Sequence, residues 1–142
     1  MSRIFALVLA LWMVVMAAPG SALVLKPGNS AVREITLPLP AEATVQLVQE
    51  ALQVWPRGEL VKTRYEDRDP AGPHWIVKGI SRTNFFKFVD DLEIDIRRDP
   101  AHPEQSLVTL TSVGRQGEYD FGGNGRNLQE LLATLNTLQQ RS

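Results

Sequence analysis

Apolar and charged residues alternate over positions 91–97, and this pattern constrains the fold more than any other in the sequence. Leucine or isoleucine stands at 92, 94 and 96, and a charged residue stands at 93, 95 and 97. Successive side chains of a β-strand point to opposite faces of a sheet. The segment therefore predicts a strand with one buried face and one face in water, as in an antiparallel sheet that is covered on one side.

Three further segments are predicted to be strands, at residues 60–66, 74–81 and 106–113. The connections between the strands are rich in turn residues: positions 67–73 hold Asp, Pro and Gly, and positions 99–104 hold two prolines. Short consecutive hairpins predict an antiparallel meander. Residues 23–40 contain three prolines and are interpreted as an extended lead-in, with residues 32–37 as a candidate for one more strand.

Helical patterns flank the strands. Apolar residues at 45, 48, 52 and 55 share one helical face, and this helix begins at residue 40 or 41 and ends before Pro56. Leucines at 128, 131, 132, 135 and 138 form a second stripe. Asn127 followed by Glu130 fits a capping pair, and Asn124 is a second candidate cap one turn earlier. The predicted fold is α+β in the order α-β-β-β-β-α, with two helices on one face of a four-stranded antiparallel meander.

The first 22 residues have the pattern of a secretory signal peptide. Arg3 precedes an uninterrupted apolar run over residues 4–18, and Gly20 and Ala22 provide a small-x-small cleavage site. The alternative is a retained membrane anchor, although a spanning helix needs about 20 apolar residues. We expect cleavage after Ala22 and export to the periplasm or, in a photosynthetic bacterium, to the thylakoid lumen. Residues 41–142 then form a single domain behind the lead-in.

Composition excludes several classes of function. The chain has 142 residues with a formal net charge of −1, which gives no electrostatic case for nucleic-acid binding. It contains no cysteine, which excludes disulfides, thiol catalysis, cysteine metal sites and a lipoprotein anchor. The mature domain would be large enough to bury one modest core without disulfides.

Few residues suggest catalysis. His74 and His102 lie in no metal-binding spacing, so we predict no metal site and interpret both as solvated. The glycine-rich stretch at 121–126 fits neither a P-loop nor a dinucleotide-binding motif, so it is interpreted as a tight turn and no cofactor is predicted. Asp90 and Asp91 are adjacent in a predicted strand and should point to opposite faces, which argues against an acid–base dyad.

Aromatic residues offer a second kind of candidate site. Core packing is one interpretation for them, and one wall of an apolar pocket is the other. The residues concerned are Trp75, Phe85, Phe86 and Phe88.

Two motifs over residues 85–128 resemble those of the bacterial and plastid family called domain of unknown function 1499. The matching positions are Val89, Asp90, Asp91 and Glu93 in the first motif and Arg115, Gly117, Asp120, Gly122 and Asn124 in the second. Two positions depart from the family pattern. Gly114 stands where the family usually has Ser, and Asn127 stands where it usually has Arg. Arg126, one residue earlier, is a candidate to take the place of that arginine. The resemblance implies a fold and a set of residues but no reaction.

The motif residues have two interpretations. Asp120 and Asn124 flank the glycine-rich turn, and Arg115 is placed to form a bidentate pair with Asp90, Asp91 or Asp120. The favoured interpretation is a polar brace that ties the last strand, the turn and the final helix to the strand of the two aspartates. In the alternative, Arg115 binds an anionic ligand that Asp90 and Asp120 orient.

The favoured function is a non-catalytic binding or accessory protein for a small apolar or lipid-like ligand, or for a membrane-protein partner. The alternative is a small hydrolase or isomerase that uses Asp90, Asp91 or Asp120 as a base, with Arg115 as an anion clamp. A cavity that holds two of these groups would favour the enzyme. A third hypothesis, a purely structural role, predicts an exposed apolar patch and no pocket.

Overall fold

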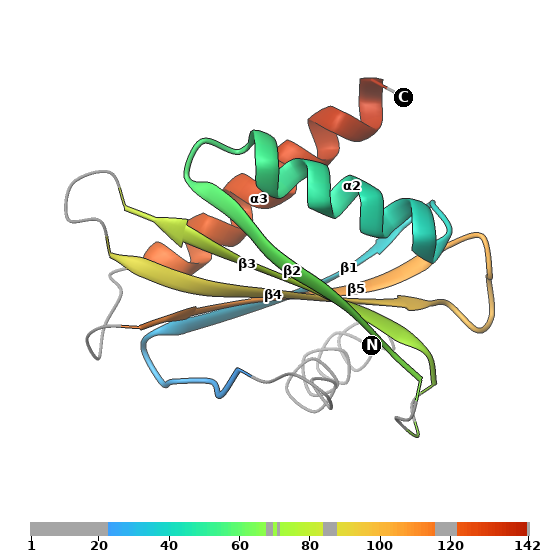
Figure 1. Cartoon of the computed structure of the whole chain (residues 1–142), viewed down its shortest axis with the longest axis horizontal. Coiled ribbons are helices and arrows are strands. Elements are labelled where there is room, and N and C mark those ends of the chain that lie inside the picture. Colours follow the sequence, from blue (N-terminus) through green and yellow to red (C-terminus); the bar gives the residue numbers. More distant parts are fainter. Residues whose placement is uncertain (1–22, 68–69, 71, 84–87, 116–121, 142) are drawn as a thin grey trace, which may run out of the picture.

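The structure is a computed structural model that describes residues 23–67, 70, 72–83, 88–115 and 122–141. Its elements are, in chain order, β1 (Ser30–Leu37), α2 (Ala41–Val54), β2 (Gly58–Glu66), β3 (His74–Arg82), β4 (Val89–Arg98), β5 (Ser106–Gly114) and α3 (Gly123–Arg141). The described strands form one antiparallel sheet in the order β1-β5-β4-β3-β2. Both helices lie on the same face of this sheet (Figure 1).

The α+β class, the meander of β2 to β5 and the helices on one face are confirmed. The predicted count of four strands is wrong, because Ser30–Leu37 in the lead-in forms β1 and pairs with β5 from Ser30↔Val113 to Leu37↔Ser106. Only Leu37 of this edge strand is buried. The sequence did not establish this strand for two reasons. A strand with so little buried surface shows weak alternation of apolar and polar residues, and its hydrogen-bonding partner lies far along the chain.

The strand that led the prediction, β4, alternates as expected. Residues 92, 94 and 96 are buried in the core that the helices cover. The opposite face is not simply solvated, since Glu93 is only 2% exposed and Asp95 only 8%. Each carboxylate lies near a cation, with Lys78 Nζ 3.9 Å from Glu93 Oε1 and Arg97 Nε 3.2 Å from Asp95 Oδ1. Burial raises the pKa of Asp95, and Arg97 offsets only part of that rise.

The two helices divide the sheet between them. Helix α2 packs over β2, β3 and β4, and α3 packs over β1 and β5 and against α2. Their apolar faces and the facing strand residues form one core. Its largest fully buried members are Val48, Leu52, Val77, Leu92, Ile94, Ile96, Leu110, Leu128, Leu131 and Leu135.

Helix α3 begins at Gly123, one turn before the predicted capping pair. Gly122 precedes it with φ of 84°, a left-handed conformation that favours glycine, as the tight-turn interpretation predicted. Asn124 and Asn127 are therefore inside the helix, and both are buried. The capping prediction is wrong because these two amides hydrogen-bond to side chains of other elements instead of to the start of their own helix.

Candidate functional site

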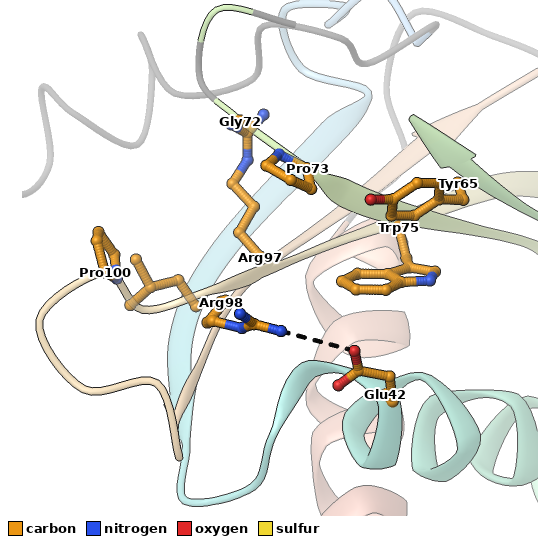
Figure 2. A pocket seen from close by; sticks show the side chains of 9 residues that line it. Glu42, Tyr65, Gly72, Pro73, Trp75, Arg97, Arg98 and Pro100 are labelled. Carbon is orange, nitrogen blue, oxygen red and sulfur yellow. Dashed lines mark ion pairs between the residues drawn. The ribbon is translucent and has the colours of Figure 1, made fainter. Parts of the chain in front are cut away.

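A groove of about 900 Å³ lies at the end of the helix–sheet layer where α2 begins (Figure 2). Segments far apart in the sequence contribute to it. They are the first turn of α2, the neighbouring ends of β2, β3, β4 and β5, and the β2–β3 and β4–β5 hairpin connections. The described residues that line it are Glu42, Tyr65, Gly72, Pro73, Trp75, Arg97, Arg98, Pro100 and Leu107. The volume falls within the range of about 300–1,000 Å³ that is usual for small-molecule sites.

Two aromatic rings contribute to the apolar part of the groove. Tyr65 of β2 and Trp75 of β3 are direct cross-strand partners, and their ring centroids lie 4.9 Å apart with planes tilted by 54°. Pairing in the sheet fixes this contact, since side chains of directly opposed residues stand on the same face. Tyr65 remains 52% exposed. The pair therefore presents aromatic surface to the groove instead of filling it.

Charged groups border the aromatic pair. Arg98 Nη2 lies 3.8 Å from Glu42 Oε1 across the groove, and both side chains are more than half exposed (Figure 2). Arg97, the preceding residue on β4, has its guanidinium Nε 3.2 Å from Asp95 Oδ1. Because neighbouring strand residues point to opposite faces, Arg98 shares the face of Trp75 and Arg97 does not.

The two histidines lie in different environments. His102 is exposed in the β4–β5 hairpin, as predicted, but His74 at the start of β3 is fully buried, so its interpretation as solvated is wrong. His74 Nδ1 lies 3.1 Å from the carbonyl oxygen of Gly72, a groove residue, and its Nε2 lies 3.7 Å from Glu66 and 3.9 Å from Asp95. Among the described residues, no three His, Asp or Glu side chains are grouped so that they could hold a metal ion.

A buried polar network occupies the opposite end of the same layer. At its centre, Asn127 Nδ2 donates to Asp90 Oδ2 at 2.7 Å and to Ser112 Oγ at 3.2 Å. Asn127 Oδ1 accepts from Arg57 Nη2 at 2.8 Å. One amide of α3 is thus bonded to β4, β5 and the turn after α2.

The network continues toward β1. Ser112 Oγ donates to Asn124 Oδ1 at 2.6 Å, and Asn124 Nδ2 donates to Asn29 Oδ1 at 3.0 Å. The backbone of Asn29 accepts from the amide of Gly114 at 3.1 Å. A Cβ at Gly114 would lie only 2.2 Å from Asn29 Oδ1, so this strand end can approach Asn29 only because it lacks a side chain.

The other arm of the network is charged. Glu130 Oε1 accepts from Arg57 Nε at 3.1 Å and from Trp55 Nε1 at 3.0 Å. Burial on its own would raise the pKa of Glu130, but these two hydrogen bonds and the positive charge of Arg57 outweigh it, so the pKa is lowered. The carboxylate is therefore held in its ionised form.

Asp90 and Asp91 point to opposite faces, as predicted. Asp90 is buried under α3, and Asp91 lies on the other face, where it accepts two hydrogen bonds from Arg115: 2.9 Å from Nε and 2.8 Å from Nη2. This hydrogen bonding raises the pKa of Arg115. Of the three aspartates considered for the bidentate pair, Asp91 is the partner, while Asp120 and Gly117 lie outside the described residues.

The predicted aromatic wall is divided. Trp75 lies in the groove near the start of β3, whereas Phe88 directly precedes β4, beyond the pair Arg82↔Val89 at the opposite end of the β3–β4 ladder. Phe88 is 48% exposed. The structure does not bring Trp75 and Phe88 together, and Phe85 and Phe86 lie outside the described residues.

Comparison with known proteins places the chain in a family. The family model described as "Protein of unknown function (DUF1499)" matches residues 21–135. The chain belongs to the DUF1499 family. No curated protein matches the sequence. Among solved structures, the chain is similar to a START superfamily protein from Mycobacterium smegmatis with 14% identity and a TM-score of 0.43, over 81% of this chain and 100% of that one. This similarity is too distant to inform the site.

Both positions at which this DUF1499 protein departs from the motif lie in the polar network or directly against it. Gly114 lies against the side chain of Asn29, which is a member of that network. Arg126 is exposed and does not replace the arginine expected at position 127. Arg57, which follows α2, carries a guanidinium to Asn127 instead. Sequence reasoning missed Arg57, Ser112 and Asn29 and gave Glu130 only a capping role, because none of them stands in a recognisable spacing with its partners.

The described helices of the DUF1499 protein are α2 and α3. Neither is long and apolar enough to cross a membrane.

Proposed function

We propose that this DUF1499 protein is an exported, non-catalytic binding module that holds the apolar body of a small ligand in the groove beside Tyr65 and Trp75. The observation that carries the proposal is the aromatic pair on the wall of a cavity of about 900 Å³, in which Tyr65 is half exposed and contacts the partly buried Trp75. The apolar run at residues 4–18 supports export.

The energetics of aromatic surface favour a ligand here. Removing apolar surface from water stabilises by about 25 cal/mol per Å², and a stacked ring adds about 1 kcal/mol beyond that. In the free protein, part of the aromatic surface of Tyr65 and Trp75 is still in contact with water, so a ligand that covers it would gain this stabilisation. The flanking strands hold both rings in place, so a ligand that covers them loses little free energy in ordering the site.

The geometry gives the hydrolase or isomerase alternative no comparable support. Asp90 is bonded within the polar network under α3, and Asp91 is paired with Arg115 on the other face. These groups do not converge on the groove, which lies at the opposite end of the layer. A purely structural role predicts no pocket, and the groove argues against it.

Ligand binding is tested with N-phenylnaphthylamine, a neutral probe that fluoresces in apolar surroundings. We expect it to bind the purified protein and Tyr65→Ala to weaken binding about tenfold, the equivalent of one stacked ring and its burial. Phe88→Ala is the matched control, since Phe88 is exposed to the same degree at the other end of the sheet. Absence of binding, or equal loss in both variants, contradicts the proposal.

Export is tested separately by intact-mass measurement of the protein purified from its natural host. A chain that begins at Leu23 supports cleavage after Ala22. A chain that keeps residues 1–22 contradicts the cleaved form and favours the anchor.

A further inference from the structure

We propose further that the ligand carries an anionic group, a carboxylate or a phosphate, and that Arg98 binds this group in exchange for Glu42. This inference rests on the proposed function and names the chemical class of the ligand: an amphiphile with an apolar body and an acidic head. It is carried by the arrangement of Arg98, Glu42 and the aromatic pair.

Arg98 is the cation that stands beside the aromatic rings. Trp75 pairs with Ile96 across the β3–β4 ladder, and Arg98 follows two residues later on the same face. The adjacent Arg97 is bonded to Asp95 on the other face by two contacts, at 3.2 and 3.5 Å. A ligand lying on Tyr65 and Trp75 therefore meets the guanidinium of Arg98 at its end.

The present partner of Arg98 is weakly held. The Arg98–Glu42 pair has an N···O distance of 3.8 Å, and both side chains are more than half exposed. Exposed pairs of this kind contribute about 0.5 kcal/mol. The Arg115–Asp91 pair shows what a firm arginine–carboxylate contact looks like in the same protein, with two hydrogen bonds of 2.8 and 2.9 Å. A ligand carboxylate or phosphate that bonds Arg98 in this bidentate way would displace Glu42 at little cost.

The start of α2 adds to the positive potential at this place. Its N-cap residue is Pro40, which supplies no side-chain hydrogen bond, and Glu42 in the first turn lines the groove. The N-terminus of a helix carries about half a positive charge and favours an anion nearby. The Glu42 carboxylate already occupies such a position between this helix end and Arg98. It marks where a ligand anion would lie.

Displacement of N-phenylnaphthylamine by three amphiphiles of equal chain length tests the inference: dodecanoate and dodecyl phosphate below their micelle concentrations, and dodecanol below its solubility limit. We expect at least one anion to displace the probe at about tenfold lower concentration than the alcohol, as for one charge-assisted contact. The stronger of the two anions identifies the head group as carboxylate or phosphate.

Two variants test whether the preference for an anionic head group depends on Arg98 and Glu42. Arg98→Gln should abolish the preference for the anion and leave dodecanol displacement unchanged. Glu42→Gln, which removes the competing carboxylate, should strengthen anion binding about threefold, the equivalent of an exposed ion pair. Arg82→Gln is the matched control, because Arg82 also forms an exposed pair, with Glu59 at 3.2 Å, at the other end of β3.

The outcomes separate the two proposals. If the probe binds but anion and alcohol displace it equally, the anionic head is wrong and the apolar groove stands. Weaker anion binding after Glu42→Gln overturns the exchange, because Glu42 would then support the site. If neither probe nor amphiphile binds the wild-type protein, both proposals are contradicted.

Discussion

The two ends of the helix–sheet layer are built in opposite ways. Where α3 begins, polar side chains bond to one another from the part-buried Glu130 and Arg57 to the buried Asn127, and from Ser112 through Asn124 to Asn29. Where α2 begins, a groove remains, and Tyr65 is left half exposed beside it. The difference shows that the polar side chains are satisfied by one another at one end of the layer, whereas aromatic surface is left exposed at the other.

The comparison predicts that stability and binding can be changed independently. A buried polar group that loses its partner costs the free energy of its desolvation. Removal of an exposed aromatic ring lowers the free energy of unfolding only slightly. Substitutions in the polar network should therefore lower stability without affecting the groove, and substitutions in the groove should do the reverse.

Asn127→Ala should give the largest effect, because it removes three hydrogen bonds at the centre of the network. Asp90 loses its 2.7 Å donor while it stays buried. We expect the free energy of unfolding to fall by about 3 kcal/mol, measured by urea denaturation with an unchanged m-value. Gln129→Ala, on the exposed side of α3, controls for the loss of a helical amide. A fall in probe binding at the groove that matches the fall in stability would show that the two ends of the layer are coupled.

Gly114→Ala should have the next largest effect. The new Cβ would lie within 3 Å of three side-chain atoms of Asn29, which is itself bonded to Asn124. Overpacking at such a site costs about 2 kcal/mol. A double-mutant cycle with Asn29→Ala identifies the cause. The loss of stability in the double variant should be smaller than the sum of the losses in the two single variants. Full additivity would show that Asn29 is not the group in the way.

Local patterns were sufficient to predict the meander, both helices and the buried face of β4. Each of these rests on a period of two or 3.6 residues within one segment. Edge strand β1 was not counted, because it buries little surface and pairs with a strand far along the chain. The prediction also took the buried His74 as solvated, since nothing in its neighbours along the chain reveals Glu66 and Asp95.

The candidate site was harder to predict than the fold. Asn127 looks like a cap when only its own helix is considered, but its partner Asp90 stands 37 residues away. The groove combines residues from α2 and from β2, β3, β4 and β5, and no spacing in the sequence links them. Trp75 was predicted to pack in the core or to form one wall of an apolar pocket together with Phe88, and in the structure the ring beside it is that of Tyr65.

Glu130→Gln should produce a smaller, pH-dependent loss in the charged arm of the network. Since the pKa of Glu130 is lowered in the folded state, its ionisation stabilises the fold fully at neutral pH. This contribution is lost as the pH falls below about 4 and through the folded-state pKa. The difference in Tm between wild type and variant should therefore be largest at neutral pH and shrink in acid. Glu50→Gln on α2 controls for the removal of one negative charge, and a difference that grows in acid contradicts the assignment.

Asp91→Asn should give the smallest effect, and it isolates the effect of burial, because Asp91 is the direct neighbour of Asp90. Its two hydrogen bonds from Arg115 are as short as those in the network, but the Arg115 side chain is 53% exposed. Water screens such a pair and solvates either partner after substitution, so we expect a loss of about 0.5 kcal/mol in urea denaturation. Asp90 and Asp91 are both aspartates of β4, and they differ in how far their side chains are buried. A loss at Asp91 as large as that of Asn127→Ala would mean that hydrogen-bond geometry, and not burial, sets the stability of this end of the molecule.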